Sequence, residues 1–212
     1  AALPWVAGLI GNSWVRILNI ALLYVMLALG LNIVVGFAGL LDLGYIAFYA
    51  VGAYVYGLLA SPHLTDNFET IATLFPDGLH LSIWLMIPLG ALIAALFGVL
   101  LGAPTLRLRG DYLAIVTLGF GEIIRLFLNN LNAPVNITNG PQGINMIEPV
   151  QIAGVRFSRT VDLFGIEVPA LHLYYYLFLA LTLLIILVCM RLQNSRIGRA
   201  WTAIRDDEIA AK

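Results

Sequence analysis

The sequence predicts an all-α integral membrane protein, a polytopic helical bundle with broken or re-entrant helices. Hydrophobic residues make up 61% of the chain and charged residues only 11%, whereas an ordinary soluble domain carries roughly 25% charged residues. The apolar residues run in blocks near the ~20 residues that a helix needs to cross about 30 Å of hydrocarbon. The charged residues lie mostly between these blocks, so we expect helices in lipid that are joined by polar segments.

Five apolar blocks are predicted as the membrane segments of this chain, which we expect to be a fragment of a longer protein. Asp42 separates the first two blocks and lies among Gly36, Gly39 and Gly44. Because glycine costs about 1 kcal/mol relative to alanine in a helix interior, we expect a break over residues 36–44, either a cytoplasmic turn or a break at the membrane midplane. The blocks cover about residues 14–41, 43–60, 81–103, 112–128 and 171–190.

Basic residues predict which segments face the cytoplasm, because cytoplasmic loops carry an excess of Lys and Arg. The short loop 104–111 carries two arginines, and the tail 191–212 carries four arginines and the only lysine. Both lie on one side of the membrane if each block crosses once, and we assign that side to the cytoplasm. Segments 61–80 and 129–170 are then extracytoplasmic, and residues 1–212 form a single transmembrane domain.

Two charged residues lie within the fourth block. Glu122 and Arg125 are three residues apart and therefore share one helix face, roughly 15–20 Å along the block at 1.5 Å per residue. A charge at this depth costs about 2.5–3.5 kcal/mol on insertion scales. The pair therefore either lines or gates a polar pathway, or neutralises itself and holds helices together.

Glycines precede the charged pair. Thr117 is followed by Gly119 and Gly121, which allow a helix to unwind and present backbone polar groups to a substrate, as broken helices of transporters do. Close helix packing is the alternative explanation. Asp42 is either a turn residue or a polar group within the membrane. The pathway candidates are Asp42, Thr117, Gly119, Gly121, Glu122 and Arg125.

Motifs for catalysis and nucleotide binding are missing. A phosphate-binding G-x-x-x-x-G-K-[ST] loop needs a lysine, and the only lysine is Lys212. Neither G-x-S-x-G nor H-E-x-x-H occurs, and the three histidines are scattered without ligand spacing. We therefore expect no catalytic residue, metal or cofactor on this chain. The net charge of −1 gives no indication of nucleic-acid binding.

The long polar segment contains a dense turn signal, Gly140-Pro141-Gln142-Gly143. Just before it, Asn136-Ile137-Thr138 matches a glycosylation sequon. We favour the alternative, a loop closed by a side-chain cap, because three-residue matches are common by chance.

Several motifs are spread over nearly the whole chain. They are Gly30-Leu31-Asn32, Gly36-Phe37-Ala38-Gly39, Phe48-Tyr49-Ala50-Val51-Gly52-Ala53-Tyr54, Leu106-Arg107-Leu108-Arg109-Gly110-Asp111-Tyr112, Thr117-Leu118-Gly119 with Glu122 and Arg125, Gly140 to Gly143, and Ser195-Arg196-Ile197-Gly198-Arg199-Ala200 with the residues after it. Together these motifs resemble those of a known family, the permease subunits of branched-chain amino-acid ABC importers of the LivM type.

The resemblance implies a permease in the bacterial inner membrane that forms the pathway for branched-chain or related amino acids. Its implied partners are a second homologous permease, two ATPase subunits that bind ATP and Mg, and a periplasmic substrate-binding protein, which the turn Gly140, Pro141, Gln142 and Gly143 would contact. A permease for urea or short amides, and a channel or secondary transporter, remain alternatives. An integral-membrane enzyme is disfavoured because the acids and histidines are dispersed.

The tail resembles the cytoplasmic coupling segment with which such permeases dock onto their ATPases. From the residues alone, Ala200, Ala203, Ile204 and Ala211 recur at roughly helical spacing and predict a small apolar stripe that can enter a groove. The implied coupling residues are Arg196, Gly198, Arg199, Ala203, Arg205, Asp207, Glu208, Ala210 and Ala211.

Overall fold

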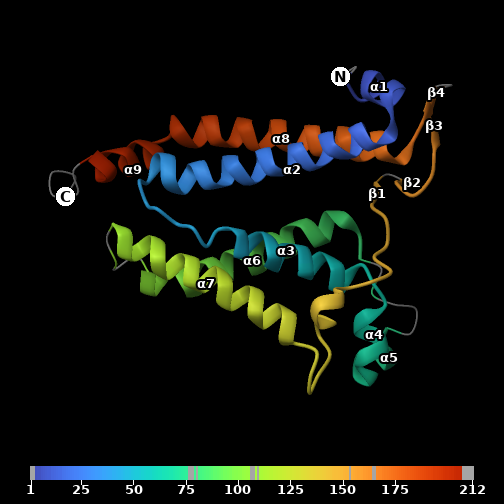
Figure 1. Ribbon diagram of the computed structural model, residues 1–212, viewed down its shortest axis with the longest axis horizontal. Helices are drawn as coiled ribbons and strands as arrows, with labels where there is room; N and C mark the ends of the chain where they lie inside the picture. The colour runs from blue at the N-terminus through green and yellow to red at the C-terminus, as the bar shows by residue number, and fades with distance from the viewer. Residues whose placement is uncertain are drawn as a thin grey trace. The chain divides into compact units, whose positions relative to one another are not determined.

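A computed structural model shows a chain made of helices with short strands in one connecting segment (Figure 1). The chain divides into two compact units. Unit 1 comprises Ala1–Leu41 and Ala153–Lys212, and unit 2 comprises Asp42–Ile152. The structure describes residues 3–75, 79, 81–105, 108, 110–152, 154–163 and 166–206.

Unit 1 is built around two long parallel helices, α2 and α8, that lie side by side (Figure 1). Tyr175, Thr182 and Cys189 are buried on α8 at seven-residue spacing, which keeps one helix face against a neighbour. Near the start of α8, the Asn19 side chain of α2 donates a hydrogen bond to the Leu171 carbonyl oxygen at 3.2 Å. The helices are α1 (Leu3–Ile10), α2 (Asn12–Asn32), the π-helix η1 (Ile33–Phe37), α8 (Ala170–Gln193) and α9 (Arg196–Asp206).

Unit 2 packs α3 against α6 and α7. Gly98 of α6 lies opposite Phe48 of α3, whose ring carbon would be in ordinary van der Waals contact, at 3.8 Å, with a Cβ at that position. The elements are α3 (Ile46–Leu59), α4 (His63–Asn67), α5 (Glu69–Leu74), α6 (Ile83–Thr105), α7 (Asp111–Asn130), the 3-10 turn η2 (Gly140–Gln142) and the strand β1 (Gln151–Ile152).

Three further short strands belong to unit 1 and lie within the segment predicted to be extracytoplasmic. They are β2 (Val155–Arg156), β3 (Val161–Leu163) and β4 (Ile166–Val168). Strands β3 and β4 pair antiparallel, with Val161 opposite Val168 and Asp162 opposite Glu167. These short strands leave the predicted helical character of the membrane segments unchanged.

The predicted break over residues 36–44 is confirmed. Helix α2 ends at Asn32, η1 follows as a single π-helical segment, and α3 begins only at Ile46. Gly39 has a φ of +69°, a left-handed conformation that glycine adopts without strain. π-helical segments are rare and occur often at functional sites.

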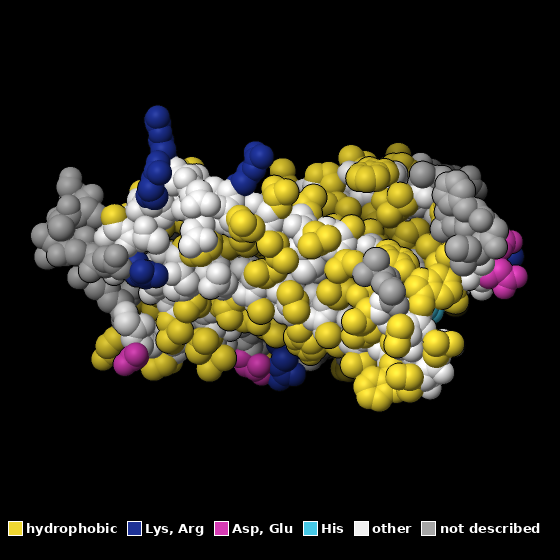
Figure 2. Space-filling view, turned by 90° about the horizontal axis from the view of Figure 1, so that it is seen from above, with side chains coloured by type: hydrophobic (Ala, Val, Ile, Leu, Met, Phe, Trp, Pro, Cys, Tyr) yellow, Lys and Arg dark blue, Asp and Glu magenta, His cyan; other side chains and the backbone are white. Residues whose placement is uncertain are grey.

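The exterior of the helices is apolar, as expected where lipid is the solvent. Large side chains such as Val99, Ile115 and Leu184 are more than half exposed. Hydrophobic side chains cover much of the face in Figure 2, and several Arg side chains lie toward the end where α9 lies. Among the residues that the structure describes, three helical segments are long and apolar enough to cross a membrane: Asn12–Phe37, Ile83–Thr105 and Ala170–Gln193. Helix α3 is apolar but shorter, so five crossings remain a prediction.

Candidate functional site

The first turn of α9 is locked against the end of α8 in unit 1. The Ser195 hydroxyl accepts a hydrogen bond from the Gly198 backbone N–H at 3.1 Å and donates one to the Leu192 carbonyl oxygen at 2.6 Å. A serine at this position is a standard helix N-cap. Gly198 is buried, and a Cβ there would collide with the Leu192 carbonyl oxygen. Glycine is therefore required for the close approach of the two helices.

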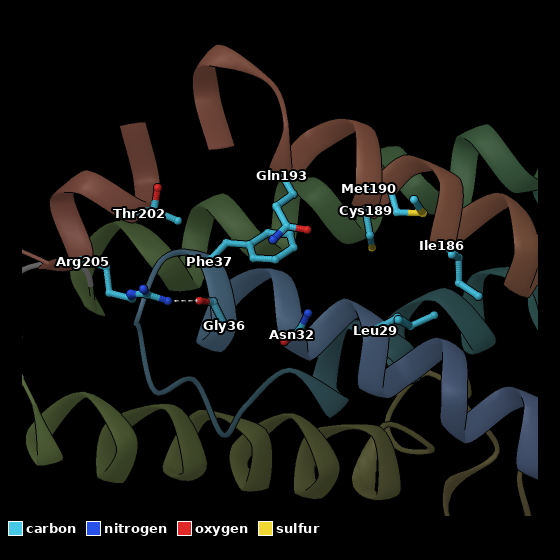
Figure 3. Close-up of a pocket in the computed structure, with 10 residues that line it drawn as sticks. All are labelled: Leu29, Asn32, Gly36, Phe37, Ile186, Cys189, Met190, Gln193, Thr202 and Arg205. Carbon is cyan, nitrogen blue, oxygen red and sulfur yellow. Dashed lines mark hydrogen bonds between the residues drawn. The ribbon is translucent and has the colours of Figure 1, made fainter. Parts of the chain in front are cut away.

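The last turn of α9 contacts the helix break. Arg205 donates a hydrogen bond from Nη1 to the Gly36 carbonyl oxygen at 2.6 Å (Figure 3). Its aliphatic part lies over Gly39, where a Cβ would collide with the Arg205 Cγ. A charge-assisted hydrogen bond of this kind is stronger than a neutral one. Helix α9 is thus held at both ends, by the end of α8 and by η1.

A cavity of about 480 Å³ opens between these elements (Figure 3). One part of its lining is apolar and includes Phe37 and Ile186, and the other part is polar and includes Gln193 and Arg205. The Asn32 side chain lies over Gly36, where a Cβ would collide with the amide oxygen. The lining residues are Leu29, Asn32, Gly36, Phe37, Ile186, Cys189, Met190, Gln193, Thr202 and Arg205.

Four of the five predicted coupling residues that the structure describes are exposed on α9. Arg196, Arg199 and Ala203 are exposed, whereas Gly198 is buried and Arg205 contacts η1. Ile197, Ala200 and Ile204 are exposed as well, at the spacing of one helix face. The predicted helix is present up to Asp206. Four predicted coupling residues lie outside the described residues: Asp207, Glu208, Ala210 and Ala211.

In unit 2, the turn before α3 is bound to α7. The Asp42 carboxylate accepts a hydrogen bond from the Gly44 N–H at 2.8 Å, and the Leu43 N–H donates to the Thr117 hydroxyl at 3.0 Å. A Cβ at Gly44 would collide with the Thr117 carbonyl oxygen, and one at Gly121 would lie 3.5 Å from the Gly44 Cα. The Asp42 side chain thus closes the turn, and Gly44 and Gly121 permit the contact.

Helix α7 is continuous from Asp111 to Asn130, so the structure shows no unwinding, which was one of the two explanations for Gly119 and Gly121. In lipid an unpaired backbone group costs several kcal/mol, which favours an unbroken helix. Gly121 packs near the turn, and Gly119 is exposed with open space around its Cα. Close packing, the alternative explanation, accounts for Gly121 but leaves Gly119 unexplained.

Glu122 and Arg125 form an ion pair on one face of α7. Arg125 donates from Nε to the Glu122 Oε2 at 2.9 Å and from Nη2 to Oε1 at 2.5 Å. Both side chains are more than half exposed, Arg125 by 60% and Glu122 by 53%. They line a groove of about 690 Å³. The rest of its lining comes from α3, from α7 and from the turn before α3, and includes Leu43, Tyr49 and Leu118. The predicted shared face is therefore present.

The polar segment after α7 caps the helix. Thr138 is only 1% exposed, and its hydroxyl donates to the Leu128 carbonyl oxygen at 2.6 Å. This contact satisfies one of the carbonyl groups that a helix end leaves unpaired. A side-chain cap was the favoured interpretation of this segment. The following turn places Pro141 and Gln142 on the surface, with Gly140 and Gly143 at φ values of +57° and +69°.

Some residues of the cavity have no counterpart in the predicted site. Asn32, Gln193 and Thr202 line it, but they were not among the sequence candidates. A signal was available for Asn32, a polar residue near the end of a long apolar block. Within the described ranges, no group of three or more His, Cys, Asp or Glu side chains is placed to hold a metal ion.

The fold defines the class of the protein, a multi-pass helical membrane protein whose polar features cluster at two places. Residues 13–212 match the family described as "Branched-chain amino acid transport system / permease component". The chain therefore belongs to this family of transport-system permeases.

Two curated relatives match the chain, and both have the same name. The chain is 42% identical over 217 residues to the "High-affinity branched-chain amino acid transport system permease protein LivM" of Escherichia coli (strain K12), and 42% identical to the protein of that name from Salmonella typhimurium (strain LT2). Each alignment covers 96% of this chain and 46% of the relative. The chain thus spans about half the length of these relatives. No solved structure matches the chain significantly.

Proposed function

We propose that this chain belongs to the transmembrane permease subunit of an ATP-driven importer and forms part of the pathway for branched-chain or related amino acids. The observation that carries the proposal is 42% identity to a branched-chain amino acid permease over 96% of the chain. The apolar exterior and the two polar clusters support it, because a permease needs both a lipid-facing surface and a polar route. The membrane is the bacterial inner membrane.

The pathway residues lie in unit 2. Glu122 and Arg125 provide the charged groups of the groove, and Asp42 and Thr117 fix the turn that contributes Leu43 to its lining. Gly119 lines the groove and has open space around its Cα. Gly121 permits the close approach of Gly44 in the turn before α3. A solute crossing here is moved without chemical change.

Energy comes from partner subunits. The chain has no phosphate-binding lysine loop, so ATP and Mg are bound by two ATPases. The exposed face of α9, with Arg196, Arg199 and Ala203, is the docking element for one of them, continued by the residues after Asp206. Because Arg205 bonds to Gly36, a displacement of α9 acts directly on the helix break.

Two further partners complete the assembly. A second homologous permease covers the remaining side of the pathway. A periplasmic binding protein delivers the solute, and the exposed turn at Pro141 and Gln142 is its contact. Segments 61–80 and 129–170 then face the periplasm, and residues 104–111 and 191–212 face the cytoplasm.

Transport in proteoliposomes tests the proposal. The full-length protein is purified with its co-expressed partner subunits and reconstituted with ATP enclosed and the binding protein outside. Radiolabelled leucine should accumulate only when both ATP and the binding protein are present, and urea or acetamide should not compete. Uptake without ATP would instead indicate a channel or secondary transporter, and uptake of urea in place of leucine would indicate an amide permease.

A further inference from the structure

We propose that the groove beside α7 is a binding site for a zwitterionic amino acid with an aliphatic side chain. The α-ammonium group binds Glu122, the α-carboxylate binds Arg125, and the side chain lies along the apolar wall of the groove. This proposal rests on the proposed function. It adds that the permease itself selects the solute, in addition to the selection made by a binding protein.

The geometry of the ion pair leaves room for both charges of the ligand. Arg125 uses Nε and Nη2 toward Glu122, whereas a guanidinium has five N–H bonds in a rigid fork. The edge formed by Nη1 and Nη2 matches a second carboxylate in a bidentate contact. Each Glu122 oxygen accepts one hydrogen bond from Arg125 and has a further lone pair for an ammonium group. The ligand therefore binds without breaking the pair.

The rest of the groove matches an aliphatic side chain. Its volume of about 690 Å³ lies within the range of roughly 300–1,000 Å³ typical of small-molecule sites, which are mostly apolar with a few polar groups. Ile46, Ile115 and Leu118 line it together with Tyr49. The two charged groups of the lining, Glu122 and Arg125, are paired with each other, so a bound amino acid has its charged end at the pair and its apolar end among these residues.

The charge pattern selects a zwitterion over other occupants. Glu122 and Arg125 are more than half exposed on α7 among exposed apolar side chains such as Ile115, Leu118 and Leu126, and a lipid tail offers no hydrogen-bonding group to either of them. A lone anion or cation would be attracted by one member of the pair and repelled by the other. A zwitterion contacts both members with opposite charges.

Ligand binding to the resting protein tests the site. The full-length protein with its co-expressed partners is placed in nanodiscs without ATP or binding protein, and tritiated L-leucine binding is measured by scintillation proximity. Saturable binding is expected. 4-Methylpentanoate lacks the ammonium group and 3-methylbutylamine lacks the carboxylate, so each should compete at least about tenfold more weakly than L-leucine.

Four variants separate recognition from stability. Glu122→Gln and Arg125→Gln should each weaken leucine binding by about 10- to 100-fold, as expected for loss of a contact to a charged group. The exchange variant, Glu122→Arg with Arg125→Glu, keeps an ion pair at i,i+3 but presents the charges in reverse order, so it should bind as weakly as the single variants. Asp111→Asn removes a charge from the exposed start of the same helix and should bind normally.

Three results would overturn the site: no saturable binding to the original protein, equal competition by the two singly charged probes, or normal binding in the exchange variant. The last would show that the pair only stabilises α7. Uptake driven by ATP in the same preparations reports the proposed function separately. If uptake is normal and leucine binding is unchanged by Glu122→Gln and Arg125→Gln, the proposed site is wrong and the proposed permease function stands. If the original protein shows no uptake, the proposed function is wrong.

Discussion

At the scale of single residues, several glycines are required because another part of the chain approaches them closely. Gly198 meets the Leu192 carbonyl oxygen, Gly44 meets the Thr117 carbonyl oxygen, and Gly39 lies beneath the Arg205 side chain. A collision with backbone is costly to relieve, whereas a flexible side chain can move aside. The three glycines therefore differ in how well each tolerates a methyl group.

Gly198→Ala should destabilise the junction of α8 and α9. The added methyl group meets a backbone carbonyl oxygen, and overpacking of this kind costs typically about 1–3 kcal/mol. The measurement is the thermal unfolding midpoint of the purified protein in detergent. Gly90→Ala is the matched control, because Gly90 lies inside α6 with open space around its Cα, and it should be neutral or stabilising by up to about 1 kcal/mol. Equal midpoints for the two variants would contradict the close approach.

Arg205→Ala should uncouple ATP hydrolysis from uptake. The variant loses the hydrogen bond to Gly36, and hydrogen bonds to charged groups contribute about 1.5–3 kcal/mol. Leucine uptake by the assembled importer should fall about tenfold or more, while ATP hydrolysis remains. Arg191→Ala, an exposed arginine near the end of α8, is the control and should transport normally. Normal uptake by Arg205→Ala would show that the contact with η1 does not transmit motion.

At the scale of elements, the apolar blocks gave the long helices almost directly. The block predicted over residues 112–128 is the helix Asp111–Asn130, and that over 171–190 is Ala170–Gln193. Long apolar runs leave few alternatives in lipid, because only a helix satisfies its own backbone there. The same reason explains why α7 is not unwound at its two glycines, the alternative that competed with close packing. The glycine cost of about 1 kcal/mol is smaller than that of exposing backbone groups to lipid.

The break between α2 and α3 was predictable because Asp42 and several glycines interrupt the apolar run together. The contact between α9 and this break, which lies in the lining of the cavity, was not predictable. It joins Gly36 and Arg205, which are 169 residues apart, and no local pattern specifies a partner at that separation. Spacing alone did predict that Glu122 and Arg125 share a face. Spacing could not predict that α3 lies beside this pair. The groove forms because α3 packs there against α7.

Thr138→Val should loosen the end of α7. Valine keeps the shape of threonine, but it removes the hydroxyl that donates to the Leu128 carbonyl oxygen. Because Thr138 is 1% exposed, water cannot replace the lost donor, and an unsatisfied buried group costs about 1–3 kcal/mol. Hydrogen exchange of the last turn of α7 should become faster. Thr73→Val removes an exposed hydroxyl bonded within its own helix and should leave exchange in α7 unchanged. Equal exchange in the original protein and Thr138→Val would show that the cap contributes nothing.

At the scale of the whole molecule, the number of membrane crossings depends on α7 as well as on the shorter α3. Helices of 23 and 24 residues, α6 and α8, exceed the ~20 residues that a span needs. Helix α7 has 20 residues and is therefore about 30 Å long at 1.5 Å per residue, which suffices in length. It also carries Asp111, Glu122 and Arg125. An amphipathic helix of this composition could instead lie at the membrane surface.

Cysteine labelling decides whether α7 crosses. The native thiol is removed with Cys189→Ala, and single cysteines are placed at three exposed positions, Asp111, Gln142 and Arg196. If α7 spans the membrane, its two ends lie on opposite sides. A membrane-impermeant maleimide should then label position 142 in spheroplasts, and positions 111 and 196 only in inverted vesicles.

The pattern of labels distinguishes the topologies because each crossing changes the side. If α7 lies on the surface, positions 111 and 142 share a side, and the single crossing of α8 still separates 142 from 196. The pair 111 and 142 therefore reports α7 alone, while the pair 142 and 196 reports α8. Because Lys and Arg are retained in the cytoplasm, the arginines of α9 predict a cytoplasmic position for residue 196, and labelling of 142 and 196 tests the predicted sides of both ends of α8. Suppose that positions 111 and 142 are labelled from the same side, and that both are fully labelled after permeabilisation. This result would contradict the five-crossing topology, and it would also contradict a transmembrane position for Glu122 and Arg125.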